Sequence, residues 1–159
     1  MTFSPEMEAR FAQMIERYPA GRQRAALIPM LMYAQDEVGS ITPEVAEEVA
    51  RRLDITTLHV DEIVSYYSML HSKRLGRHHV QICTNVSCML RGGAELWDRA
   101  CRRLGIGHKQ ATADGRISLE EVECIGACSW APALQVNYEF YHNVTAQQLE
   151  RLLDRLGAG

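Results

Sequence analysis

The sequence predicts a small α/β domain that follows a bundle of helices. The first part of the chain, residues 1–70, carries helix-start signals and apolar residues at helical spacing. From residue 77 to residue 159, short strand-like segments are interleaved with helical ones, an order typical of a layered α/β fold. The chain has 159 residues, of which 47% are hydrophobic, so it can bury the core of one domain with an extension. We therefore expect two domains, a helical bundle over 1–70 and an α/β domain over 77–159.

Local signals place the helices of the first part. Ser4-Pro5-Glu6 combines a capping serine, a proline at the first helical position and an early acid, and Thr42-Pro43-Glu44 repeats this pattern. Thr56 is expected to cap a short fourth helix. Residues 22–38 form the second expected helix, and Pro29 within it predicts a kink or a later start.

The second part contains strand, hairpin and helix signals. Residues 78–82 are a strand candidate, and Gly93–Leu104 is a helix with one apolar side. Asp114-Gly115 and Asn137-Tyr138 are expected to form the turns of two hairpins. Thr145 should cap a final helix with a stripe of leucines.

Composition and charge exclude several classes of function. The net charge is −3 and the chain has no long basic run, so nucleic acid is not an expected partner. The longest apolar stretch, Ala25–Ala34, has ten residues, whereas a membrane-spanning helix needs about 20, so we expect no direct membrane insertion. Residues 1–6 lack the basic and apolar parts of a signal peptide, which predicts an unexported, cytoplasmic protein.

Four of the five cysteines form two close pairs, Cys83-x4-Cys88 and Cys124-x3-Cys128. An odd number of cysteines in an unexported chain argues against a disulfide framework, because such thiols stay reduced. Each pair follows a predicted strand, so each is expected in a loop whose backbone N–H groups can point at sulfur. Paired thiolates of this kind are typical ligands of zinc or of an iron–sulfur cluster.

The spacing favours a [2Fe–2S] cluster but leaves zinc open. Structural zinc sites mostly have gaps of about two residues, although gaps of up to about four occur. Two irons spread their ligands further than one zinc does, so the longer gaps suit a [2Fe–2S] site better. A plant-type ferredoxin would have its third cysteine at the position of Arg91, and the chain lacks the Cys-x-x-Cys pair of a thioredoxin-type dithiol. A structural zinc-binding adaptor is therefore the alternative from a different class.

Other chemistry-bearing residues have plainer interpretations. Cys101 is expected to be a small buried residue on its helix. Hydroxyl groups that could donate hydrogen bonds to sulfur belong to Thr84, Ser87 and Ser129. Surface positions are expected for His71, His78, His79 and His142. The chain has no Gly-x-Gly-x-x-Gly fingerprint, so it has no evident nucleotide-binding site of its own.

Residues 66–77 show no clear period and are expected to form a linker. Tyr66, Tyr67 and Met69 lie at its start, where they either pack against the helices or face a partner protein.

The two cysteine loops together resemble a known family. Residues 83–92, Cys-Thr-Asn-Val-Ser-Cys-Met-Leu-Arg-Gly, and residues 122–128, Val-Glu-Cys-Ile-Gly-Ala-Cys, are similar to the cluster loops of the E subunit of bacterial NADH–quinone oxidoreductase (respiratory complex I). Residues 24–29 and 64–67 fit as well, so the resemblance covers nearly the whole chain. The family implies a thioredoxin-like [2Fe–2S] ferredoxin domain preceded by an N-terminal helical bundle. The cluster ligands it implies are Cys83, Cys88, Cys124 and Cys128.

The resemblance also implies a function and a partner. The chain would be an electron-transfer subunit of NADH–quinone oxidoreductase, a quinone-reducing translocase, and its [2Fe–2S] cluster would exchange one electron with the FMN of a partner flavoprotein that oxidises NADH. The enzyme would be the whole complex, since this chain has no evident substrate site. The complex would place the chain at the inner face of the cell membrane, as a peripheral subunit. An equivalent subunit of an NAD-linked hydrogenase or formate dehydrogenase is the alternative within the same class. Thioredoxin-like folds often have a cis proline before a strand, and Pro132 is the residue at that place.

Overall fold

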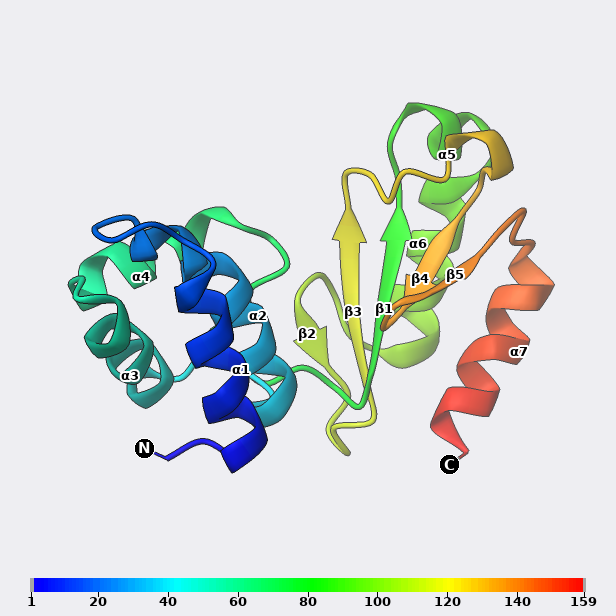
Figure 1. Cartoon of the computed structure of the whole chain (residues 1–159). Coiled ribbons are helices and arrows are strands. Elements are labelled where there is room, and N and C mark those ends of the chain that lie inside the picture. The colour runs from blue at the N-terminus through cyan, green and yellow to red at the C-terminus, as the bar shows by residue number, and fades with distance from the viewer. Residues whose placement is uncertain (1, 159) are drawn as a thin grey trace. The chain divides into compact units, whose positions relative to one another are not determined.

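The computed structural model describes residues 2–158, and the chain divides into two compact units, Met1–Arg74 and Leu75–Gly159 (Figure 1). Each unit has a hydrophobic core of its own. The first unit is helical and the second is mixed α/β, which confirms the fold class expected from the sequence.

The helices of the first unit begin at the predicted capping residues. The side-chain oxygens of Ser4, Thr42 and Thr56 each accept a hydrogen bond from the backbone N–H three residues further on. The helices are α1 (Pro5–Glu16), α2 (Leu27–Val38), α3 (Pro43–Leu53) and α4 (Thr57–Tyr66).

The second helix starts later than residue 22, as Pro29 allowed. A short 3₁₀ turn over Gln23–Ala26 comes first, and α2 follows from Leu27. Pro29 is then the third residue of α2, where a backbone N–H would have no partner within the helix, so its missing donor is harmless. Gly39 ends α2 in the left-handed region, with φ of 94°.

The core of the first unit takes side chains from each of these helices. The largest of the fully buried ones are Phe11, Met30, Leu31, Val45, Val49 and Val60. Leu70, beyond the end of α4, is only 4% exposed and belongs to the same core. The linker expected over residues 66–77 therefore begins later, because Leu70 holds the preceding chain against the helices.

The second unit is built on one sheet. Its strands are β1 (His78–Cys83), β2 (Gln110–Ala111), β3 (Ile117–Val122), β4 (Leu134–Val136) and β5 (Glu139–Tyr141), and their order across the sheet is β2-β3-β1-β4-β5. β1 and β3 are parallel, and the other neighbours are antiparallel. The helices are α5 (Val86–Leu90), α6 (Gly93–Leu104) and α7 (Ala146–Gly157).

The turns predicted for this unit are confirmed, whereas one helix was missed. Asp114-Gly115 joins β2 to β3, and Asn137 joins β4 to β5 with φ of 52°. Thr145 caps α7 in a capping box with Gln148. The sequence predicted only a loop where the structure has α5.

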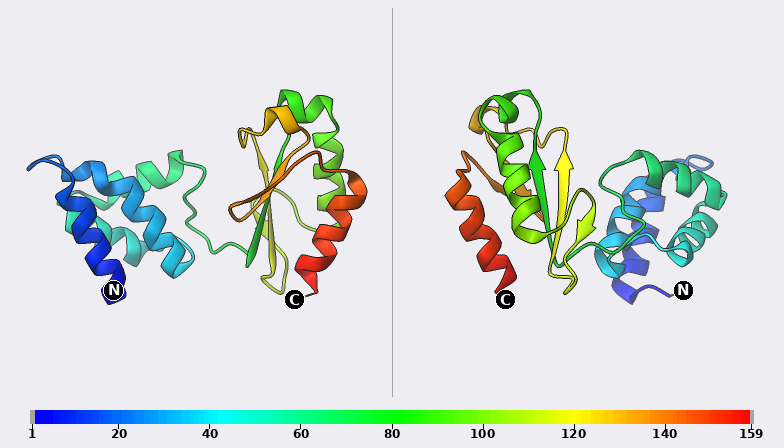
Figure 2. Two further views of the ribbon diagram at one scale, coloured as in Figure 1. Left: turned by 45° about the vertical axis from the view of Figure 1, so that its right-hand side comes forward. Right: turned by 180° about the vertical axis from the view of Figure 1, so that it is seen from behind.

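Helices α6 and α7 lie on the same face of the sheet (Figures 1 and 2). The buried side chains that meet between these helices and the strands include Val80, Ile82, Leu96, Leu119, Leu134 and Leu149. Because side chains alternate along a strand, the other face of β1 and β3 carries polar residues, among them Gln81 and Ser118. The sheet thus has one apolar face and one polar face.

His79 lies on the polar face and is buried, so the surface position expected for it is wrong. It is 8% exposed. Its Nδ1 lies 2.9 Å from Ser118 Oγ, and its Nε2 lies 3.0 Å from Glu120 Oε2. Gln81 Nε2 donates a hydrogen bond to the same Glu120 oxygen at 3.0 Å. Ser118 and Glu120, which contact the His79 ring, belong to β3, far along the chain.

Candidate metal centre

The parallel pairing of β1 and β3 brings the two cysteine loops to one end of the sheet. Cys83, the last residue of β1, lies opposite Val122, the last residue of β3. The Thr84 N–H then donates to the Val122 carbonyl at 3.3 Å, which extends the pairing into the first loop. Figure 1 shows α5 and the turn before β4 together at this end. Cys124 follows Val122 by two residues, so both cysteine pairs start from neighbouring strand ends.

The first loop contains a helical turn that returns the chain toward Cys83. Asn85 accepts a hydrogen bond from the Val86 N–H at 2.7 Å and begins α5. Cys88 lies within α5, not in the open loop expected from the sequence, because this cap and the burial of Cys88 stabilise a helix too short for periodicity to reveal. Cys83 and Cys88 are buried, at 4% and 3% exposure.

The second loop is more open. Cys124 and Cys128 are both exposed. The Gly126 N–H donates to Cys124 Sγ at 3.3 Å, and Gly126 adopts a φ of 75°, which favours glycine. The Cys83 thiol donates to the Glu123 carbonyl at 3.8 Å, which connects the two loops directly. A backbone donor therefore points at sulfur, as the sequence suggested.

The thiols of Cys83 and Cys128 lie close enough to Cys88 to affect it. Burial raises the pKa of the Cys88 thiol to about 11, a backbone hydrogen bond from Ala133 opposes the rise, and the nearby thiols of Cys83 and Cys128 add to it. A bound metal would reverse this, because coordination removes the thiol proton. The small residues packed around the buried pair are Ala127, Ala131 and Ala133. Soft sulfur donors that are surrounded by small side chains are suited to bind a zinc ion or an iron–sulfur cluster.

The loop hydroxyls differ in what they contact. The Thr84 hydroxyl donates to Glu121 Oε1 at 2.8 Å, so it is already used by a carboxylate and not by sulfur. Ser87, half-buried one residue before Cys88, and Ser129, exposed one residue after Cys128, keep the sulfur-directed role as a prediction.

The chain after the second loop returns to β1. The Ala131–Pro132 peptide bond is cis, as the resemblance allowed. The Cys83 N–H donates to the Ala133 carbonyl at 3.3 Å, so the start of β4 is joined to the first cysteine. Trp130 is 53% exposed, and its ring lies 5.2 Å from that of His142, which is exposed as expected.

Gly93 is a residue of this site that the sequence reasoning missed. It begins α6 and is buried against both cysteines of the first loop. A Cβ atom built on it would lie 2.7 Å from the Cys83 carbonyl oxygen and 2.8 Å from that of Cys88. The only signal in the sequence is a glycine pair, Gly92-Gly93, a few residues after Cys88.

Cys101 and the three residues Tyr66, Tyr67 and Met69 lie outside this centre. Cys101 is half-buried and packs against the core on α6, and burial raises the pKa of its thiol. Tyr66 is 81% exposed and Met69 is 46% exposed, whereas Tyr67 packs against the helical core.

Within residues 2–158, no helix has both the length and the apolar character that crossing a bilayer requires.

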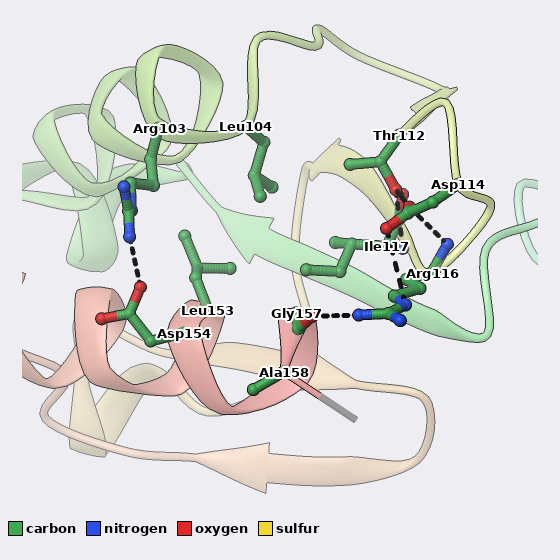
Figure 3. Close-up of a pocket in the computed structure, with 10 residues that line it drawn as sticks. All are labelled: Arg103, Leu104, Thr112, Asp114, Arg116, Ile117, Leu153, Asp154, Gly157 and Ala158. Atoms are coloured by element: carbon green, nitrogen blue, oxygen red, sulfur yellow. Dashed lines mark hydrogen bonds and ion pairs between the residues drawn. The ribbon is translucent and has the colours of Figure 1, made fainter.

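A cavity of about 390 Å³ lies at the other end of the sheet (Figure 3). Arg103 of α6 pairs with Asp154 of α7, and Arg116 reaches the Gly157 carbonyl at the end of α7. The charged groups around the cavity are thus engaged with one another, and they connect α6, α7 and the β2–β3 hairpin. We interpret the cavity as a gap between these structural contacts, remote from the cysteine centre.

Comparison with known proteins points to one family. The family model described as thioredoxin-like [2Fe-2S] ferredoxin matches residues 11–157. The NADH-quinone oxidoreductase subunit 2 of Thermus thermophilus is 41% identical over 100% of this chain and 88% of its own length. An E subunit of the NADH-quinone oxidoreductase of Rhizobium meliloti is 40% identical over 99% of this chain and 90% of its own.

A solved structure shares the fold. The NAD+-reducing [NiFe]-hydrogenase in the air-oxidized state superimposes with a TM-score of 0.74 at 20% sequence identity. The match covers 84% of this chain but only 23% of the hydrogenase chain, so the likeness concerns one part of a longer protein.

Proposed function

Since this chain belongs to the thioredoxin-like [2Fe–2S] ferredoxin family, we propose that Cys83, Cys88, Cys124 and Cys128 hold one [2Fe–2S] cluster. The observation that carries the proposal is the meeting of two cysteine loops, distant in sequence, at the paired ends of β1 and β3. The family's cluster chemistry matches a site with four sulfur donors. The units Met1–Arg74 and Leu75–Gly159 would then be a helical domain and a cluster-binding domain.

Each pair of cysteines has its own task in this proposal. Cys83 and Cys88 would hold the cluster from the buried side of the site, and Cys124 and Cys128, which are exposed, would complete its ligands. The Gly126 N–H stabilises negative charge on the Cys124 sulfur. Hydrogen bonds of this kind, together with burial, are what the protein uses to set a cluster's reduction potential. When bound, a [2Fe–2S] cluster supplies one-electron transfer.

In the cell, the chain serves as the electron-transfer subunit of an NADH–quinone oxidoreductase. Its relatives in Thermus thermophilus and Rhizobium meliloti carry the names of subunits of that complex and match nearly the full chain. The cluster exchanges one electron with the FMN of a flavoprotein partner that oxidises NADH, because a flavin can divide the electron pair that NADH delivers. This chain has no nucleotide-binding fingerprint of its own, so NADH binds to the partner. The complex holds the chain on the inner face of the cell membrane.

The first experiment tests the cluster. The full chain is purified without oxygen, its iron and sulfide are assayed, and electron paramagnetic resonance (EPR) spectra are taken before and after reduction. We expect about two irons and two sulfides per chain, a brown colour that bleaches on reduction and a signal in the reduced state only. A colourless chain with bound zinc would overturn the proposal and support the structural adaptor instead.

A second experiment tests the partner. The chain is produced together with the flavoprotein subunit of the same organism, and NADH is added to the purified complex. We expect reduction of the cluster by NADH in the complex but not in the isolated chain. A cluster that dithionite reduces but NADH never does, even with the flavoprotein bound, would contradict the electron-transfer role. Quinone reduction by the assembled complex separates this role from that of an NAD-linked hydrogenase or formate dehydrogenase subunit.

A further inference from the structure

Gly93 occupies a position where a side chain has no space. A Cβ atom on it would lie 2.7 Å from the Cys83 carbonyl oxygen, 2.8 Å from the Cys88 carbonyl oxygen and 2.9 Å from the Cys88 carbonyl carbon. All three are backbone atoms, which cannot rotate away as the end of a side chain can. The first turn of α6 therefore packs directly on the backbone of both cysteines.

The other glycines near the site are needed for a different reason. Gly92 has φ of 92° and Gly126 has φ of 75°, so each adopts a backbone conformation that other residues rarely take. A Cβ on Gly126 would meet nothing within 4 Å, and one on Gly92 would first meet Glu95 Oε2 at 3.8 Å. Gly93 is not in the left-handed region, so close approach alone requires glycine there.

The two elements that meet at Gly93, α6 and β1, are both held by the core. Leu96 and Ala100, which follow Gly93 along α6, are 3% and 0% exposed in the core. On β1, Val80 and Ile82 are both fully buried in the same core. A methyl group at residue 93 would therefore displace the segment between the two anchored elements, residues 84–92 with Cys88, relative to Cys83 at the end of β1.

We propose that Gly93 is a positioning residue that sets the backbone separation of Cys83 and Cys88, and through it the placement of their two sulfur atoms. This inference rests on the proposed function, since these cysteines are the proposed ligands. Gly93 touches the backbone of both residues and acts on the cluster only through them.

The test compares Gly93→Ala with Gly76→Ala in the full chain. Gly76 is a matched control because it is also buried, and a Cβ there would lie 2.5 Å from the backbone of Ile117 and Ser118. Gly76 precedes β1, at the end of the sheet opposite the cysteines. Both variants introduce a backbone collision into the same unit, so both should lower the urea midpoint, and only one collision lies at the site.

The readouts separate positioning from stability. In the cluster-loaded protein, we expect Gly93→Ala to shift the EPR g values and the midpoint potential, or to lower the iron and sulfide content per folded chain. In the cluster-free protein, we expect faster alkylation of Cys88 in Gly93→Ala under native conditions, measured by mass spectrometry. Gly76→Ala should match the wild type in each of these measurements.

Three results would overturn the inference. They are a Gly93→Ala protein identical to the wild type, equal changes in both variants, and a Gly93→Ala chain that does not fold, because the strain would then not be confined to the loop. A wild-type chain that binds no cluster would instead count against the proposed function, and the alkylation measurement would still test the placement of Cys88.

Discussion

Replacing Glu48 with glutamine is expected to destabilise the helical unit at neutral pH and to have much less effect in acid. Glu48 lies on α3, where its carboxylate accepts hydrogen bonds from Arg51 and Arg52. These contacts, first of all the one with Arg51, lower the pKa of Glu48 from 4.5 to about 2. Because the folded pKa lies below the unfolded one, this stabilisation is complete above about pH 5 and is lost as the pH falls toward about 2.

The pKa difference sets an upper limit to the effect. The step from 4.5 to about 2, at about 1.36 kcal/mol for each pH unit, gives about 3.4 kcal/mol. Arg51 is 69% exposed, so water screens its contact, and exposed pairs contribute about 0.2–1 kcal/mol. Arg52 is only 17% exposed and lies over the ring of Phe11, so its contact is better shielded. We therefore expect a loss of about 1–2 kcal/mol at neutral pH.

Urea unfolding followed by far-ultraviolet circular dichroism measures this loss. Trp97 and Trp130 are the only tryptophans and both lie in the second unit, so tryptophan fluorescence follows that unit separately. Glu48→Gln should lower the dichroism midpoint at about pH 7, lower it by less than half as much at about pH 3, and leave the fluorescence midpoint unchanged. Glu47→Gln, which changes an exposed carboxylate on the same helix, is the control. Equal losses at the two pH values, or an equal loss in the control, would refute the argument.

Three further outcomes are expected. Cys124→Ser should lose or alter the EPR signal of the cluster, whereas Cys101→Ser should keep it, because Cys101 packs among apolar residues of α6; a lost signal in the latter would contradict the ligand assignment. Thr145→Ala should lower the free energy of unfolding in urea by about 1 kcal/mol, because it removes the capping box of α7, and an unchanged midpoint would show that the cap is dispensable. Ser87→Ala and Ser129→Ala should shift the midpoint potential of the cluster in a redox titration. Unchanged potentials in both variants would show that these hydroxyls do not tune the cluster.

Local signals made most of the helices predictable. Ser4, Thr42, Thr56 and Thr145 begin helices as expected, because a helix start depends on a few residues around the capping oxygen. The hairpin turns have the same local character. The family could also be predicted, since each cysteine loop carries several characteristic residues, and the match over residues 11–157 confirms it.

Features that depend on distant partners could not be predicted in this way. Helix α5 has five residues, too few for a helical period, and its stability depends on packing. His79 meets Ser118 and Glu120, which lie 39 and 41 residues further along the chain. Only the register of β1 and β3 reveals that pairing, and nothing near His79 in the sequence indicates it. The contact between Thr84 and Glu121 arises from the same register.

The cysteine centre combines both kinds of information, and Gly93 shows where they conflict. Helix propensity alone favours alanine over glycine, by about 1 kcal/mol in a helix interior and by less at the first residue, so Gly93→Ala looks favourable from the sequence. In the folded chain, the methyl group would instead lie 2.7 and 2.8 Å from the carbonyl oxygens of Cys83 and Cys88, which are backbone atoms and cannot rotate away. Overpacking of this kind destabilises by about 1–3 kcal/mol, so the lack of space outweighs the propensity. The spacing of the cysteines identifies the donors, but the approach of α6 to their backbone decides where those donors lie.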